Sequence, residues 1–137
     1  MSKQAQMIFI NLPVANLERS KKFYEAIGFT INKQYSDDTS ACMVLSDSIM
    51  VMLLTHGKWA RFTTKPIVDA KTSAQVLLCI SRGSRTAVDD AVKAATGAGG
   101  GPDPTPVQDL GFMYGRSFED PDGHIWETVW LNPAAAN

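Results

Sequence analysis

Apolar and polar residues alternate along the chain in a pattern that predicts short strands and two amphipathic helices. The first helix is expected to begin after Asn16, whose side chain can accept hydrogen bonds from the free amides of a first helical turn. Leu17, Tyr24 and Ile27 then fall on one face, which is the spacing of a helix that packs on a core. Gly28 follows as the helix stop. The first half of the chain is therefore predicted as a strand, a helix and three further strands.

The second half repeats this order of elements without repeating the sequence. Ser84 is a suitable N-cap residue, and Val88, Val92 and Ala95 form the apolar face of a second helix, which the glycines of residues 97–101 end. The strands of both halves are predicted at residues 7–13, 29–34, 41–45, 49–55, 74–81, near 107, 112–119 and 124–130.

Two modules of this order indicate the α+β class with mostly antiparallel strand pairing. Because one small module cannot cover both faces of its sheet, we expect tandem βαβββ modules that form a curved sheet around a cleft, with the helices on the outer face. The first module spans approximately residues 5–56 and the second 73–132. Residues 57–72 form a linker with a short helix near Trp59. A chain of 137 residues fits a single domain of this kind.

Composition and charge exclude several classes of protein. An apolar fraction of 45% is too high for a disordered chain, and a net charge of -1 without a dense Lys/Arg cluster does not favour nucleic-acid binding. The longest fully apolar run, residues 49–54, is far shorter than the ~20 residues of a membrane helix. We expect a cytoplasmic protein with no membrane partner, in which the lone cysteines Cys42 and Cys79 are buried and reduced.

The final hairpin carries the main candidate for chemistry, Glu127. Residues 120–123 (Asp-Pro-Asp-Gly) have the composition of a tight turn, and alternation after it places Glu127 on the face of Ile125 and Val129. A carboxylate on an otherwise apolar face is costly unless it has a partner or a task. Three interpretations stay open: a structural carboxylate held by hydrogen bonds, a general base in a dry cleft, and a polar anchor for a ligand.

Four segments resemble the vicinal oxygen chelate superfamily, which includes glyoxalase I, bleomycin resistance proteins, extradiol dioxygenases and fosfomycin resistance enzymes. They are NLPVANL at 11–17, SKKFY at 20–24, IGF at 27–29 and FEDPDGHIWE at 118–127. The resemblance covers nearly the whole chain and is strongest to small bacterial glyoxalase-like proteins. It implies the fold predicted above and a homodimer, in many members with the cleft completed across the interface. It does not imply one reaction, because one fold supports many chemistries.

The resemblance also implies where a metal would be held. Members of the superfamily place a His, Gln or Glu ligand on the first and the last strand of each module. These positions align here with Phe9, Leu53, Gln75 and Glu127. If the alignment shifts on the first strand, Asn11 takes the first ligand position in place of Phe9. Phe and Leu have no ligand atoms, so no metal cofactor is expected. Gln75 and Glu127 are the ligands that would remain if a metal were bound.

Further residues are expected to line the cleft around Glu127. Arg116 lies one strand away, and we expect it either at the surface or at the cleft, paired with an anionic ligand or with Glu127. Tyr114 shares the strand parity of Arg116 and would offer a hydroxyl, while Trp59 and Phe62 are placed at the cleft entrance. The predicted ligand-binding residues are Phe9, Asn11, Leu53, Gln75, Tyr114 and Arg116.

These residues support two functions of different kinds. The first is a metal-independent lyase or isomerase that acts on a small carbonyl metabolite, with Glu127 as the catalytic base. The alternative is a metal-free protein that binds and sequesters a small molecule, similar to the bleomycin resistance proteins. It is motivated by Phe9 and Leu53 at ligand positions. A domain without any ligand is the third possibility.

Overall fold

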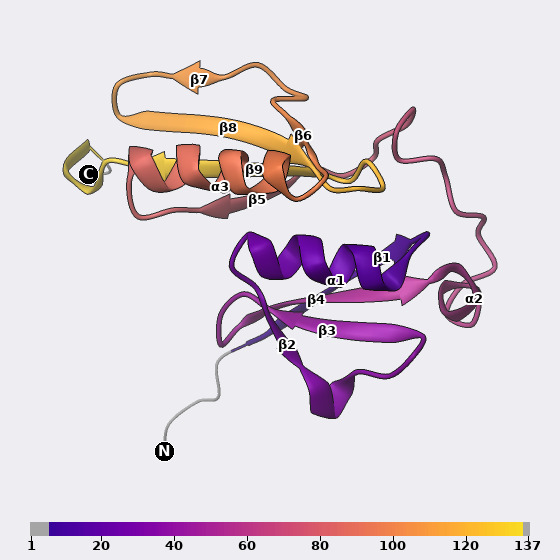
Figure 1. Cartoon of the computed structure of the whole chain (residues 1–137). Coiled ribbons are helices and arrows are strands. Elements are labelled where there is room, and N and C mark those ends of the chain that lie inside the picture. The colour runs from indigo at the N-terminus through magenta and orange to yellow at the C-terminus, as the bar shows by residue number, and fades with distance from the viewer. Residues whose placement is uncertain (1–5, 136–137) are drawn as a thin grey trace. The chain divides into compact units, whose positions relative to one another are not determined.

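The structure, a computed structural model, describes residues 6–135. The chain forms two compact units that divide between Ile67 and Val68, which we name the first unit and the second unit. Each unit holds its own hydrogen-bonded sheet and one long helix (Figure 1).

The first unit contains a mixed sheet of four strands. Its elements are β1 (Ile8–Val14), α1 (Leu17–Ala26), β2 (Thr30–Asn32), the 3₁₀ turn η1 (Lys33–Tyr35), β3 (Ser40–Val44), β4 (Ile49–Thr55) and the short helix α2 (His56–Trp59). The strand order is β1-β4-β3-β2, in which β1 runs parallel to β4 and the other neighbours are antiparallel.

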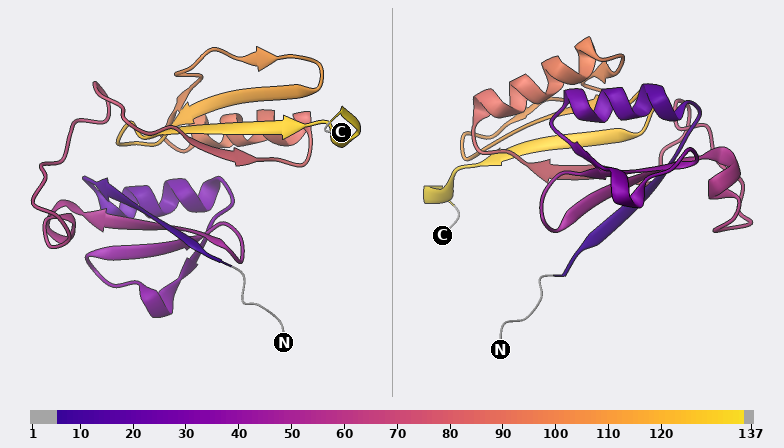
Figure 2. Two further views of the ribbon diagram at one scale, coloured as in Figure 1. Left: turned by 180° about the vertical axis from the view of Figure 1, so that it is seen from behind. Right: turned by 60° about the horizontal axis from the view of Figure 1, so that its bottom comes forward.

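The helix α1 covers one face of this sheet (Figure 2), and the strand register shows which side chains face it. Leu12 pairs with Leu53, and both are buried, as is Val51 two residues before Leu53. Phe9 and Asn11 have the opposite parity on β1 and are exposed. Since side chains alternate along a strand, the face away from α1 is the open face of the first unit.

The second unit has the same order of elements with one additional short strand. Its elements are β5 (Leu78–Ser81), α3 (Arg85–Gly97), β6 (Gly101–Pro102), β7 (Gln108–Asp109), β8 (Met113–Glu119), β9 (Ile125–Leu131) and the 3₁₀ turn η2 (Pro133–Ala135). The sheet has the order β5-β9-β8-β6, with β7 also paired to β8, and β5 runs parallel to β9.

The helix α3 packs on one face of this second sheet through Val88, Val92 and Ala95. Phe118 on β8 pairs with Trp126 on β9, and both side chains are fully buried. Complete burial of a large apolar side chain contributes roughly 1.5–3 kcal/mol, so this pair is a main part of the core of the second unit.

Local chemistry starts and stops the helices as the sequence predicts. Asn16 Oδ1 accepts a hydrogen bond of 3.0 Å from the amide of Arg19, and Ser84 Oγ accepts one of 3.0 Å from the amide of Ala87. Gly28 follows α1 with φ of +106°, a left-handed conformation that favours glycine.

The α+β class and the tandem βαβββ order are therefore confirmed. Hydrogen bonding divides the strands of residues 6–135 into two mixed sheets, one of four and one of five strands. The cleft that the two modules were expected to enclose stays a prediction.

The segment before β5 differs from the expectation. The sequence predicts a strand over residues 74–81, but β5 begins only at Leu78. The Asp69 carbonyl accepts from the amides of Thr72 and Ser73 at 3.1 and 2.9 Å, so the chain turns here instead of extending. A Cβ on Gly123 would lie 2.7 Å from the Lys71 amide nitrogen, so the β8–β9 turn approaches this segment closely.

Two further expectations need correction. Cys42 is buried as predicted, but Cys79 is exposed, because it lies on the edge strand β5 and on the face away from α3. The second strand is shorter than the predicted 29–34, because η1 follows Asn32, whose side chain accepts from the Gln34 amide at 3.0 Å. Within residues 6–135, no helix is both long and apolar enough to cross a membrane.

Candidate functional site

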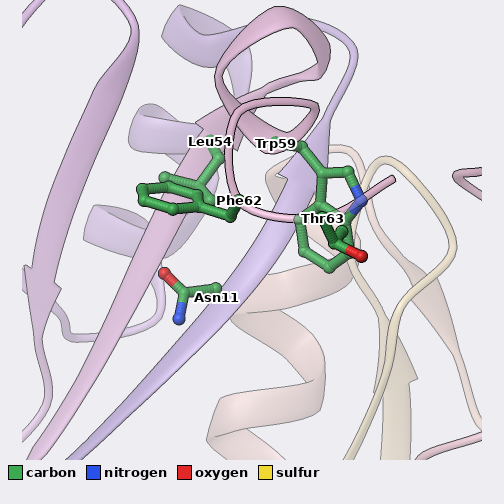
Figure 3. A pocket seen from close by; sticks show the side chains of 5 residues that line it. All are labelled: Asn11, Leu54, Trp59, Phe62 and Thr63. Carbon is green, nitrogen blue, oxygen red and sulfur yellow. The ribbon is translucent and has the colours of Figure 1, made fainter. Parts of the chain in front are cut away.

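A pocket of about 300 Å³ lies on the open face of the first unit (Figure 3). We name it the aromatic pocket. It is lined by Asn11, Leu54, Trp59, Phe62 and Thr63.

The aromatic pocket is built where β4 runs into α2. Thr55 caps this helix, because its Oγ1 accepts from the amide of Lys58 at 3.2 Å. The chain then turns back on itself, since the Trp59 carbonyl accepts from the amides of Phe62 at 2.9 Å and Thr63 at 3.4 Å. This local folding brings the ring of Phe62 to the same end of the sheet as the ring of Trp59.

The floor of the aromatic pocket comes from two neighbouring strands. Asn11 on β1 pairs with Met52, and Pro13 pairs with Leu54 on β4, so Asn11 and Leu54 project from the same face of the sheet. In Figure 3 the Asn11 amide lies near the ring of Phe62. The Asn11 side chain makes no hydrogen bond to any other residue of the part that the structure describes.

The two aromatic rings are held differently. Phe62 is 65% exposed, so much of its apolar surface has no covering within this structure. Trp59 is half-buried, and its indole Nε1 is shielded from solvent without a hydrogen-bond partner among residues 6–135. Figure 3 shows that nitrogen on the edge of the indole away from Phe62 and Asn11. The part of the indole that faces the pocket is therefore apolar, and only the amide of Asn11 and the hydroxyl of Thr63 provide polar side-chain groups.

A second cavity, of about 220 Å³, lies in the second unit and contains Glu127. We name it the carboxylate cavity. Its lining residues are Cys79, Thr105, Pro106, Gln108, Met113, Gly115, Arg116, Glu127, Thr128 and Val129.

Glu127 lies on the face of the second sheet opposite α3. Its register partners are Cys79 on β5 and Ser117 on β8. Glu127 is half-buried, and it forms no salt bridge with a cation among the described residues. Desolvation, and after it the negative charge of Glu127, raises the pKa of the Cys79 thiol. Glu127 thus lies close to the thiol of Cys79 in the carboxylate cavity.

Arg116 borders the carboxylate cavity, but its side chain and that of Tyr114 project from the other face of this sheet, so Arg116 does not pair with Glu127, which was one of its expected partners. Arg116 pairs with Thr128 across the strands, and Ser117 pairs with Glu127, so the guanidinium projects toward α3. Arg116 is bound there by Asp103 at 2.7 Å and by Asp89 at 3.1 Å.

On this second face, Arg116 lies between the carboxylates of Asp89 and Asp103. The Tyr114 hydroxyl donates to Asp89 at 2.6 Å, and this hydrogen bond, together with Arg116, lowers the pKa of the Asp89 carboxyl. The hydrogen bond from Arg116 lowers the pKa of Asp103, and the same contacts raise the pKa of Arg116. Arg116 and Tyr114 therefore form a structural network that ties β8 to α3.

Of the other predicted site residues, one lies on the open face of the first unit, one lies in its core, and one precedes the strand β5. Phe9 shares the exposed face of β1 with Asn11, although it does not line the aromatic pocket. Leu53 has no exposed surface and faces α1, so its assignment as a ligand-binding residue is wrong, and Leu54 lines the pocket instead. Gln75 is exposed and precedes β5, so Cys79 occupies the strand position opposite Glu127 that was assigned to Gln75.

The donor atoms do not fit the metal site of the superfamily. Phe9 and Leu53 carry no ligand atoms, and Gln75 lies outside the strand that would position it. Between residues 6 and 135 there is no group of three or more His, Cys, Asp or Glu side chains arranged to hold a metal ion. No chemical step is therefore assigned to a metal.

Sequence reasoning missed Leu54 and Thr63 and placed Trp59 and Phe62 only at an entrance. The spacing of Trp59 and Phe62, three residues apart after Thr55, contained a usable signal. A capped turn brings residues with that spacing to one side.

The comparisons with known proteins agree with this fold. Residues 6–46 match the family described as bleomycin resistance protein-like N-terminal. No curated protein matches the chain.

Solved structures resemble the chain over nearly its whole length. A hypothetical protein from S. aureus is 25% identical, with a TM-score of 0.77 over 94% of this chain and 96% of that one. A glyoxalase/bleomycin resistance protein/dioxygenase family enzyme from Burkholderia phytofirmans is 16% identical, with a TM-score of 0.74 over 93% and 99%. A glyoxalase-related enzyme from Fulvimarina pelagi is 20% identical, with a TM-score of 0.74 over 93% and 88%. Residues 6–46 are thus similar to the bleomycin resistance protein-like N-terminal family, and the chain shares the fold of these glyoxalase/bleomycin resistance structures.

Proposed function

We propose that this protein binds a small planar molecule in the aromatic pocket, without a metal, in the way that a bleomycin resistance-like protein sequesters its ligand. The observation that carries the proposal is the combination of two aromatic rings, Trp59 and Phe62, with the exposed amide of Asn11 around one pocket. Small-molecule sites are mostly apolar concavities with a few polar groups, and about 300 Å³ is at the lower end of their range.

Each wall of the pocket has a defined part in binding. A planar ligand would stack on Trp59 or Phe62, and such aromatic contacts contribute about 0.5–1.5 kcal/mol beyond the burial of area. The Asn11 amide offers both donors and an acceptor, so it would fix the orientation of a polar ring edge. Burial of the exposed ring of Phe62 by the ligand supplies a further apolar gain.

The test is a fluorescence titration with a panel of planar aromatic compounds. The chain has three tryptophans, and Trp59 is the one in the pocket. We expect saturable quenching that Trp59→Phe removes, whereas Trp130→Phe, in the second unit, retains it. Asn11→Ala should weaken binding about twofold to tenfold, the effect of a lost hydrogen bond. Quenching that persists unchanged in Trp59→Phe, or no binding by any member of the panel, would contradict the proposal.

A second candidate function is the metal-independent lyase or isomerase, and the position of Glu127 in the carboxylate cavity favours it. There the carboxylate could take a proton from a carbon next to a carbonyl group. Glu127→Gln should abolish turnover of carbonyl substrates and preserve folding, while Glu119→Gln, a change outside that cavity, should preserve turnover. Retained turnover in Glu127→Gln would refute this function.

The homodimer that the superfamily implies also belongs to this proposal. Sedimentation velocity at micromolar concentration should give a dimer, and a monomer alone would refute it.

A further inference from the structure

We propose that the aromatic pocket selects planar aromatic anions, of which an aromatic carboxylate is the simplest example. This inference rests on the proposed function, because it names the class of ligand that the same pocket would bind. It comes from the charges around the pocket, which the binding proposal does not use.

The segment that builds the aromatic pocket is uniformly basic. Between Asp47 and Asp69 the chain contains Lys58, Arg61 and Lys65 and no acidic residue. All pocket residues except Asn11 lie in this segment. The net charge of the whole chain is -1, so this basic segment is a local feature that the overall composition conceals.

Lys58 does not line the pocket itself, but its side chain contacts Phe62, which does. Its Nζ lies 5.7 Å from the centroid of the Phe62 ring, over the ring face. Lys58 is half-buried, and it has no carboxylate partner among residues 6–135. A cation without a counter-ion nearby attracts an anionic group that is held close to it. An anionic group on a ligand stacked against Phe62 would supply the missing partner.

The acidic residues nearest along the sheet do not cancel this charge at the pocket. Ser40 pairs with Leu54, and Asp37 precedes it in the same turn. Asp37 Oδ1 accepts four hydrogen bonds, from the amides and the hydroxyls of Thr39 and Ser40, at 2.8 to 3.2 Å. These bonds hold the carboxylate in its own turn, and neither Asp37 nor Asp38 lines the aromatic pocket.

Two arginines of the second unit, Arg85 and Arg116, show the opposite arrangement. Arg85 is bound through two nitrogens by Asp109, at 2.9 Å each, and Arg116 is bound by Asp103 and Asp89. The charges of these two arginines are paired with carboxylates of the second unit. The charge of Lys58 is left for a ligand.

Calorimetric titration with three compounds of one shape tests the inference: naphthoate, naphthamide and naphthylmethylammonium. We expect naphthoate to bind most tightly, about fivefold or more above the neutral amide, and the cation to bind most weakly. Rising salt should weaken the binding of naphthoate and leave that of naphthamide nearly unchanged, because ions screen only the charged pair.

Lys58→Gln should reduce the affinity for naphthoate about twofold to fivefold without changing that for naphthamide. Lys93→Gln removes the same charge from an exposed position on α3 in the second unit, and it should change neither affinity. Thermal unfolding of both variants checks that the fold is retained.

The possible results separate this inference from the function on which it rests. Equal or tighter binding of naphthamide, or an equal loss for both compounds in Lys58→Gln, would overturn the selection of anions and leave the binding function standing. An equal effect of Lys93→Gln and Lys58→Gln on naphthoate would also overturn it, because net charge alone would then explain the preference. Absence of binding by all three compounds would remove both proposals for ligands of this shape.

Discussion

Replacement of Arg116 by Met should destabilise the second unit without weakening the binding of a ligand to the aromatic pocket. Arg116 donates from Nε and from one terminal nitrogen to the two oxygens of Asp103, at 3.1 and 2.7 Å, and from the other terminal nitrogen to Asp89 at 3.1 Å. The side chains of Arg116 and Asp103 are 23% and 28% exposed, so solvent screens this pair only in part.

The magnitude follows from this partial burial. Hydrogen bonds to charged groups contribute about 1.5–3 kcal/mol when buried, and exposed ion pairs about 0.2–1 kcal/mol. We therefore expect about 1–2 kcal/mol of coupling between Arg116 and Asp103. Arg116→Met alone should lower the free energy of unfolding by more than this coupling energy, because it leaves the carboxylates of Asp103 and Asp89 to repel each other. Asp103 has φ of +47°, a conformation that Asn tolerates, so Asp103→Asn removes the charge with little backbone strain.

The assay is urea unfolding of the wild type, both single variants and the double variant, at neutral and acidic pH. The pKa values of Asp89 and Asp103 are below 3.8 in the folded protein. Their stabilising contribution is therefore present above pH 3.8 and is lost as the pH falls through the lower folded values. The stability difference between wild type and Arg116→Met should shrink below pH 3.8. A coupling energy near zero, or a difference independent of pH, would refute the reasoning.

Three further predictions concern other contacts. Gly123→Ala should destabilise by about 3 kcal/mol or more and Gly28→Ala by about 1 kcal/mol, measured by urea unfolding, because both have positive φ but only the first would meet backbone within 3 Å. Asn16→Ala should cost about 1 kcal/mol in the same measurement through loss of the helix cap, and no change would contradict that role. The Asp109 carboxyl should titrate by NMR with a pKa of about 2, raised toward 3.8 in Arg85→Gln, so that its contribution to stability is present above pH 3.8 and is lost as the pH falls through about 2. If the pKa of Asp109 stays at about 2 in Arg85→Gln, Arg85 is not the main cause of the lowered pKa.

The sequence by itself determined the order of the elements, the ends of the two long helices and the final turn. Asn16 and Ser84 cap their helices, and the Asp120–Gly123 turn closes the final hairpin, with the Gly123 amide donating to the Asp120 carbonyl at 3.0 Å. These features depend on contacts within a few residues, so local composition is enough to predict them. The parity of Glu127 was predictable for the same reason, since alternation along one strand needs no knowledge of its neighbours.

Only the tertiary structure decided which side chains from different strands share a face. A shift of one residue in strand pairing moves every side chain to the opposite face. The register Ser117–Glu127 therefore places Arg116 toward α3 and its carboxylate partners, and the register Leu12–Leu53 buries Leu53 and leaves Leu54 to the aromatic pocket. The site depends on contacts between segments far apart in the chain, and those contacts arise only when the sheet assembles.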